Sequence, residues 1–192
     1  MNHVAIGLRA KTGRAIAVVL GGSPDAPTVL MKSEIKLVDP RLPQTAQPYH
    51  VVMELPWEDS QRKVQKLARA IERVAKRAVA DLVRQQQSSG NFVCGVGIVG
   101  APDRDLARIG NFHIRAHAAE GVLFRKVLNV AAEASGLKWR LIPDKDFETL
   151  TKSELGAKAA RTKRQISELG RTVPWRADEK QAAVAAWLML HK

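Results

Sequence analysis

Residues 92–99 read FVCGVGIV, and this apolar run, which lies between two helical patterns, decides the fold. Its side chains are apolar or absent, as in a strand that is buried on both faces of a sheet. Apolar residues recur at intervals of three and four over 57–87 before it and over 112–135 after it, which predicts an amphipathic helix on each side. Another strand is expected over 137–142. Strands that are joined through a helix in this way are typically parallel.

The first forty residues have a different pattern. Three runs of strand character follow one another, and the turn segments KTGR and GGSPD separate them, which predicts an antiparallel meander. Four prolines then withhold backbone donors over 39–56, so that segment is expected to be a loop or an irregular edge. The three predicted strands cover residues 4–8, 15–20 and 29–37.

Two helices are expected in the last third of the chain. Thr151 and Glu154 have the spacing of a capping box, which predicts a helix over 151–169. The run 177–190 has almost no polar face, so its helix should be largely buried. With right-handed crossovers, the whole pattern predicts one α/β domain over 1–192. Its five-stranded mixed sheet has the order 3-2-1-4-5, its first three strands are antiparallel, and helices cover both faces.

This succession of elements resembles the three-layer ribonuclease H-like fold, and specifically the RuvC type of Holliday-junction resolvase. The element order carries the resemblance over almost the whole chain. The opening VAIG at 4–7 and the run ADEKQAAVAA at 177–186 add to it. The resemblance implies carboxylates at the end of the first strand, near the end of the fourth and at the start of the last helix.

Those carboxylates are mostly missing from this sequence. The first-strand position matches Gly7, the fourth strand ends with GIVG at 97–100, and Asp178, with Glu179 beside it, is the acid that fits. Two-metal catalysis needs several oxygens to hold two ions about 4 Å apart. The resemblance therefore implies a degenerate nuclease site on a fold that handles nucleic acid.

Composition narrows the class of protein further. The 192 residues include 31 Lys and Arg against 19 Asp and Glu, a net charge of +12, and 45% are hydrophobic. This composition is typical of a globular protein with an anionic partner. The single Cys94 excludes a disulfide framework and a multi-cysteine metal site. Because no run approaches a membrane span or a signal peptide, we expect a soluble, cytoplasmic protein without a membrane partner.

The predicted topology gathers cations where the parallel strands end, which is where open α/β sheets bind ligands. Two helix N-termini are expected at the same place, and their free N–H groups attract anions. A phosphate or another anionic group is the expected ligand. The cations assigned to this site are Arg9, Lys11, Arg115, Arg176 and Lys180.

His113, His117 and Glu120 share one face of the predicted second helix. This spacing permits zinc or another divalent ion, but no further ligand is identifiable, so no cofactor and no metal ligand set are assigned. In an enzyme, either histidine could act as general acid or base. Together with Asp178 these three residues are the catalytic candidates.

The long first helix has a strongly basic face. Lysine and arginine on it would bind phosphate backbones without reading sequence. Only nine aromatic residues are present, which favours duplex or structured nucleic acid over a single-strand stacking platform. The residues assigned to backbone contact are Arg62, Lys66, Arg69 and Arg73, with Lys158 and Arg161 on the predicted third helix.

Three other interpretations stay open. A divergent nuclease could recruit Asp103, Glu120 and Asp178, or a hydrolase or transferase could act on a phosphorylated small molecule through His113 or His117. The protein could instead be a scaffold.

The motif GVGIVG at 95–100 matches a dinucleotide-binding fingerprint, but its glycines lie inside a predicted strand, which favours close packing of the last helix on the sheet.

Overall fold

Five strands form one mixed sheet in the computed structural model, which describes residues 2–23, 26–156, 164, 167–168 and 175–190. The strand order is β3-β2-β1-β4-β5. β1 pairs antiparallel with β2, and β2 antiparallel with β3, while β4 lies parallel to both β1 and β5. The predicted order and strand directions are confirmed. The strands are β1 (Asn2–Lys11), β2 (Arg14–Ser23), β3 (Ala26–Lys36), β4 (Asn91–Gly100) and β5 (Trp139–Pro143).

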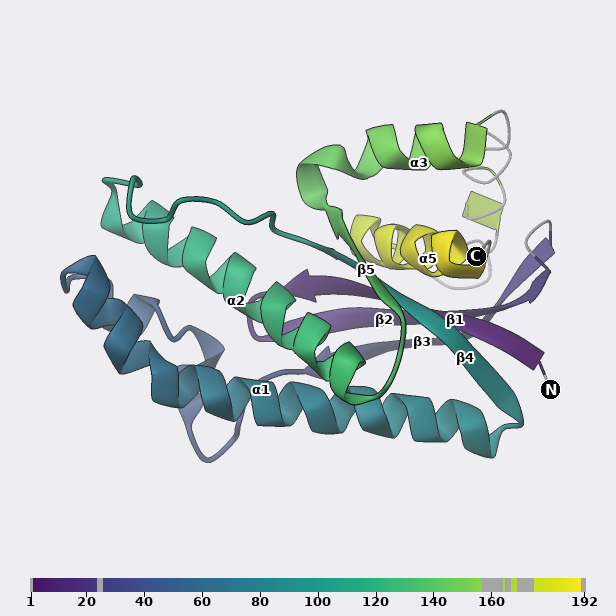
Figure 1. Ribbon diagram of the computed structural model, residues 1–192, viewed down its shortest axis with the longest axis horizontal. Coiled ribbons are helices and arrows are strands. Elements are labelled where there is room, and N and C mark those ends of the chain that lie inside the picture. Colours follow the sequence, from purple (N-terminus) through teal and green to yellow (C-terminus); the bar gives the residue numbers. More distant parts are fainter. Residues whose placement is uncertain (1, 24–25, 157–163, 165–166, 169–174, 191–192) are drawn as a thin grey trace.

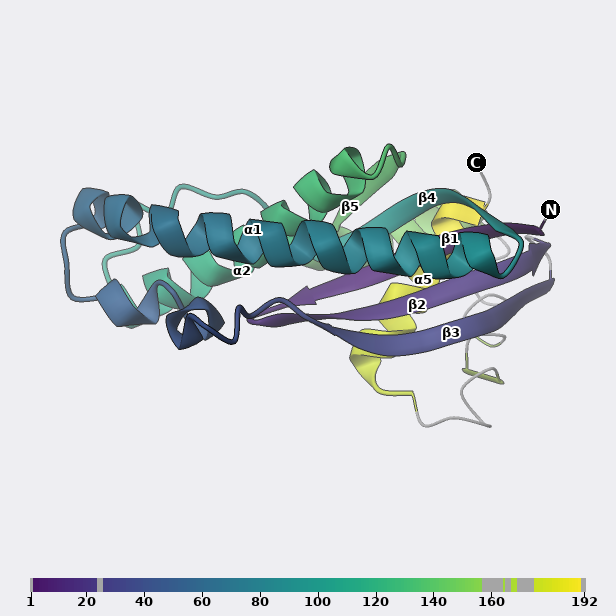
Figure 2. The ribbon, with the colours of Figure 1, turned by 90° about the horizontal axis from the view of Figure 1, so that it is seen from below.

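Helices cover both faces of the sheet, which makes three layers (Figure 1). α1 and α2 pack together on one face, and α5 lies across the other face with α3 beside it (Figures 1 and 2). The N-terminal ends of α1 and α2 extend past the tips of the strands. The helices are α1 (Trp57–Ser88), α2 (Phe112–Ala134), α3 (Phe147–Leu155) and α5 (Ala177–Leu190).

α1 is held to the sheet by a single apolar stripe. Val64, Ile71, Ala75 and Val79 follow one another at steps of seven, four and four residues and are all buried. They join the core on the α1 and α2 face of the sheet, where alternate residues of β1 also point. The opposite side of this helix is thereby left to solvent.

α5 approaches the other face so closely that side chains are excluded beneath it. A Cβ added to Gly7 would lie 1.7 Å from the carbonyl oxygen of Ala182, and one added to Gly97 would lie 2.4 Å from that of Ala185. Both glycines are in strands, so GVGIVG is a packing motif here and not a turn that opens a helix. Residues 182–189 of this helix are all buried, as its sequence predicts.

Two details differ from the sequence-based expectation. α3 begins at Phe147, and the hydroxyl of Thr151 donates to the Phe147 carbonyl at 2.6 Å, so Thr151 lies within the helix and does not cap it. The helix ends at Leu155, before Gly156, whose φ of +52° favours glycine, and the expected end at residue 169 lies outside the described residues. Lys158 and Arg161 lie outside the described residues.

The proline-rich segment is irregular, as expected. It contains only two short 3-10 helices, η1 (Pro43–Ala46) and η2 (His50–Val52), and a third, η3 (Asp144–Asp146), follows β5. Among the described residues no helix is both long enough and apolar enough to cross a membrane.

Candidate functional site

The carboxyl end of the sheet, where β1, β4 and β5 finish, gathers charged side chains from three distant segments. Arg9 and Lys11 come from the end of β1 and share the α5 side with Gly7, because side chains alternate along a strand. Asp178 comes from the first turn of α5. Asp144 comes from η3, directly after β5.

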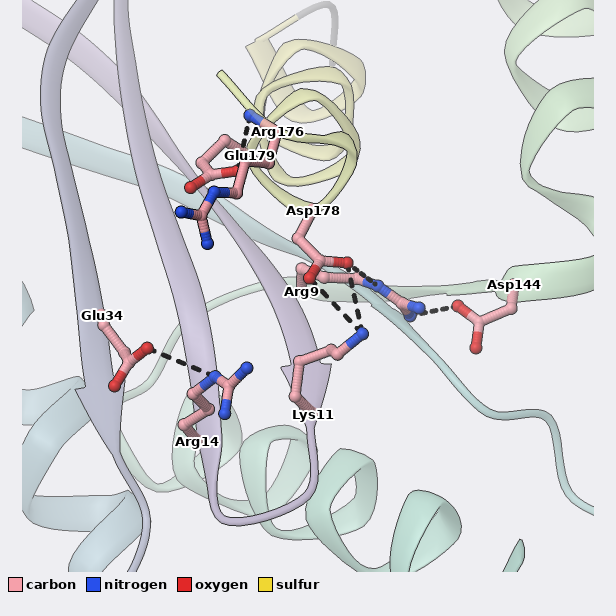
Figure 3. Close-up of polar contacts among 8 residues, drawn as sticks. All are labelled: Arg9, Lys11, Arg14, Glu34, Asp144, Arg176, Asp178 and Glu179. Carbon is pink, nitrogen blue, oxygen red and sulfur yellow. Dashed lines mark hydrogen bonds and ion pairs between the residues drawn. The ribbon is translucent and has the colours of Figure 1, made fainter. Parts of the chain in front are cut away.

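Arg9 connects the two carboxylates. Its Nε lies 3.4 Å from Oδ1 of Asp178, and its guanidinium also forms an ion pair with Asp144 (Figure 3). Nζ of Lys11 lies 3.4 Å from Oδ2 of Asp178. Only 13% of the Arg9 side chain is exposed, against 40% for Asp144. These four residues, Arg9, Lys11, Asp144 and Asp178, form the carboxyl-end cluster.

The number of acids at this end was underestimated from the sequence. Asp178 is joined by Asp144, which the sequence analysis missed. The signal was present, since Asp144 lies two residues after the end of a predicted parallel strand and the ends of such strands meet. Glu179 does not face this cluster, because its carboxylate accepts from the backbone N–H of Arg176 at 3.0 Å and so caps the start of α5.

Both carboxylates of the carboxyl-end cluster contact protein cations. The pair of divalent ions that the family resemblance implies would need several carboxylate oxygens that are free to coordinate them. Arg9 contacts both carboxylates and Lys11 contacts one of them, so protein cations occupy the positions next to these oxygens. The close contact of α5 at Gly7 also leaves no room for an acid in the middle of β1.

The expected electropositive hollow carries both signs of charge. A cavity of about 260 Å³ lies beside the cluster, and two of its lining residues, Arg14 and Glu34, form an ion pair at 3.2 Å (Figure 3). Arg176 reaches this cavity, while Lys180 is exposed on α5 and does not line it. The charged lining consists of Arg14, Lys32, Arg176, Glu34, Asp178 and Glu179.

Arg115 does not join the other predicted anion-binding cations. Its guanidinium carbon lies 5.5 Å from the ring centre of Trp57 and 5.0 Å from that of Phe112, at the N-terminal ends of α1 and α2. The residue is largely buried in this aromatic contact. The sequence-based grouping with Arg9 is therefore wrong for Arg115, because the N-terminal end of α2, which carries Arg115, lies beyond the tips of the strands.

The three acids of the alternative nuclease interpretation have separate partners. Asp103 accepts from Arg125 at 2.7 Å and lies 3.3 Å from Lys126. The hydrogen bond from Arg125 is the main reason that the pKa of Asp103 lies below its usual value. Glu120 is fully buried and bonded to His50, whereas Asp178 belongs to the carboxyl-end cluster. No group of these three acids forms within the described part of the chain.

His113 and His117 do lie together, as their spacing predicts. Their Nε2 atoms are 3.0 Å apart on the exposed face of α2. A third histidine, His50 of η2, packs against both rings, and the sequence analysis missed it. No local pattern reveals His50, because the proline-rich segment reaches α2 only through tertiary packing. Glu120, expected on the same face, points inward and supports His50.

The basic face of α1 is a surface feature, as predicted. Arg62, Lys66, Arg69 and Arg73 are all exposed, on the side opposite the buried stripe. Three cations of the helix pair with acids one turn away. Within the described residues Lys63, Lys66, Arg69 and Arg77 make no ion pair with a carboxylate.

Comparisons with known proteins agree on the fold. No protein-family model and no curated protein sequence matches the chain. A structure of Thermus thermophilus RuvC in complex with a Holliday junction substrate matches with a TM-score of 0.52 and 13% identity, over 97% of this chain and 91% of that one. A second Thermus thermophilus RuvC structure matches with a TM-score of 0.51 and 11% identity, over 96% and 92%. The chain therefore has the RuvC type of ribonuclease H-like fold.

Proposed function

We propose that this protein binds duplex or branched nucleic acid through the phosphate backbone and does not cleave it by the two-metal mechanism. The basic face of α1 is the observation that carries the proposal. Its cations have steps of four, three, four and four residues from Arg62 to Arg77 and so form one straight row. A row of cations that points away from the core is suited to a linear array of phosphates.

The unpaired cations are the important part of this row. Lys66 and Arg69 have no carboxylate partner among the described residues, so binding to phosphate would not first break an internal ion pair. Each phosphate contact releases condensed counterions, which makes the affinity fall steeply with salt. Such contacts position a protein on nucleic acid without reading bases.

The fold makes branched DNA the first probe to use. RuvC of Thermus thermophilus, which has the same fold, was solved in complex with a Holliday junction substrate. Fold alone does not decide function, so the proposal depends on the surface of this chain.

The second half of the proposal, the lack of two-metal cleavage, follows from the carboxyl-end cluster. A bound metal would have to displace a guanidinium and an ammonium group that already neutralise the two carboxylates. Arg9 would also repel the incoming ion.

Fluorescence anisotropy with a labelled four-way junction and a matched duplex tests the binding. We compare wild type with a double variant, Lys66→Gln with Arg69→Gln. The matched control, Arg104→Gln with Arg108→Gln, removes the same charge from two exposed residues of the loop before α2. We expect the α1 variant to bind more weakly and to lower the slope of log Kd against log salt by about 0.9 for each lost phosphate contact. Equal losses in both variants would contradict a role for α1.

Cleavage assays test the second half separately. Wild type is incubated with the junction and the duplex in Mg²⁺ or Mn²⁺, and the strands are separated on a denaturing gel. We expect intact strands. Cleavage that depends on metal and disappears in Asp178→Ala would overturn this half and leave the binding half in place.

A further inference from the structure

A cluster of three histidines lies where the proline-rich segment meets the N-terminal part of α2. His50, His113 and His117 each place one ring nitrogen within 4.8 Å of those of the others. The ring centres of His50 and His117 are 4.4 Å apart, and those of His113 and His117 are 4.5 Å apart. This cluster is separate from the carboxyl-end cluster and from the basic face of α1.

Glu120 orients one of the three rings. Nδ1 of His50 lies 2.8 Å from Oε1 of Glu120, and the backbone N–H groups of Tyr49 and His50 donate to the same oxygen at 3.2 and 3.3 Å. Glu120 is fully buried. A histidine whose Nδ1–H donates to a buried carboxylate presents Nε2 as the atom with a free lone pair, which is the usual support for a metal-binding histidine.

The Nε2 atom of His50 is buried and lacks a hydrogen-bond partner among the described residues. A buried polar atom without a partner is costly, so it points to a ligand at this place. His113 and His117 add two exposed rings on a helix, which can turn toward the same point.

We propose that His50, His113 and His117 bind one divalent transition-metal ion, of which Zn²⁺ is the reference. Imidazole nitrogen suits Zn²⁺, Co²⁺, Ni²⁺ and Cu²⁺, whereas Mg²⁺ and Ca²⁺ prefer oxygen ligands. Three protein ligands leave the fourth position of a tetrahedral ion to water or to an exogenous ligand. Glu120 is a positioning residue, because it holds His50 and does not itself reach the ion.

The ion would join two parts of the chain that are distant in sequence. His50 belongs to the irregular segment before α1, and the other two ligands belong to α2. A ligand that binds only the folded arrangement stabilises it. The site therefore predicts a thermal stability that rises with Zn²⁺ and not with Mg²⁺.

Titration calorimetry of untagged, metal-free protein with Zn²⁺ tests the site, and the visible spectrum of the Co²⁺ complex reports its geometry. We expect one ion per chain, the absorption bands of tetrahedral Co²⁺, and a higher Tm with Zn²⁺. His117→Ala and His113→Ala change exposed side chains, so both variants should fold, and each should lose the Co²⁺ bands and at least about tenfold in affinity. His3→Ala removes a histidine that instead packs against Phe92 with its ring tilted, and this control should bind as wild type does.

Glu120→Gln separates a positioning role from a purely structural one. The neutral amide oxygen accepts the His50 N–H more weakly than the carboxylate does, so the Zn²⁺ affinity should fall about 10–100-fold while the stoichiometry is unchanged. Circular dichroism checks that this buried variant is folded. If it unfolds, the two exposed histidine variants still decide. Absence of Zn²⁺ binding by wild type, or equal affinity in wild type and His117→Ala, would overturn the proposal.

Discussion

At the residue scale, Arg9 links the two carboxylates at the carboxyl end of the sheet. Its guanidinium contacts Asp144, which comes from η3, and Asp178, which comes from the first turn of α5. Arginine keeps its charge at every accessible pH, so the two carboxylates always have a cation between them. The carboxyl end of the sheet therefore holds an internal cation between its two carboxylates.

Replacement of Arg9 by methionine should destabilise the protein and expose a binding site for divalent ions. The two carboxylates would lose their shared partner, which we expect to cost about 1–2 kcal/mol. Mn²⁺ should restore part of the lost Tm in the variant and leave the Tm of wild type unchanged. Thermal melts with and without Mn²⁺ measure both effects.

Arg14→Met is the control for this prediction. Its ion pair with Glu34 is about half exposed on both sides, so its loss should cost about 0.5 kcal/mol or less, without any response to Mn²⁺. A Mn²⁺ response in wild type, or none in Arg9→Met, would contradict the role assigned to Arg9.

Asp103 gives the protein a pH-dependent contact. The Arg125 hydrogen bond lowers the pKa of this carboxyl in the folded state, so its ionised form stabilises the fold above the unfolded pKa of about 3.9. That contribution is lost as the pH falls through the lower, folded value. Asp103→Asn should therefore have a lower Tm than wild type near neutral pH, and the gap should close in acid. Melts over an acid-to-neutral pH series measure the gap.

Asp105→Asn is the matched control for this pH series. It makes the same charge change in the same loop, but its partner Arg108 is 87% exposed. A gap for Asp103→Asn that stays constant with pH would contradict the assignment to its carboxylate.

At the scale of elements, the distance between α5 and the sheet is set by two glycines of the sheet. Gly7 and Gly97 lie under its backbone, so the helix sits closer to β1 and β4 than side chains would allow. This close contact places Asp178 within reach of Arg9 and Lys11. The packing of α5 and the chemistry of the carboxyl-end cluster are therefore linked.

Gly7→Ala should be strongly destabilising. The added Cβ would meet the Ala182 carbonyl oxygen at 1.7 Å, and because the atoms it meets belong to the backbone of α5, the helix itself would have to move. We expect a loss of about 3 kcal/mol in the free energy of unfolding, measured by urea denaturation. Gly110→Ala, where nothing lies within 4 Å of the new methyl group, should stay within about 0.5 kcal/mol of wild type. Similar stabilities for the two variants would contradict the close packing of α5.

At the scale of the whole molecule, the sheet is buried unevenly. β1 lies between two strands and between the helices of both faces, whereas β3 is an edge strand with alternating exposed residues. Lys32 and Lys36 on β3 are exposed, and such charges discourage pairing with another chain at that edge. The free energy of local opening should therefore decrease from the centre of the sheet toward β3.

Hydrogen exchange measured by mass spectrometry should follow this order. Peptides from β1 and β4 should exchange slowest, because their opening needs global unfolding, and peptides from β3 should exchange faster. Equal protection of β3 and β1 would contradict the uneven burial of the sheet.

The sequence by itself determined the fold class, the strand order, the irregular proline-rich segment, the buried last helix and the outward basic face of α1. These features depend on local periodicity and on connection lengths, and both can be read from residues that are close together in the sequence. The same local signals misled at Thr151, where a capping pattern lies inside a helix, because a hydroxyl can also bond to the turn before it.

Only the tertiary structure decided which side chains meet. Asp144 reaches Arg9, Arg115 stacks on Trp57, and His50 completes the three-histidine cluster, each across a long stretch of sequence. Such contacts depend on where each element ends in space and on how far α2 extends past the sheet, and periodicity carries neither quantity. For that reason the framework could be predicted from the residues, while the partners within both clusters required the folded chain.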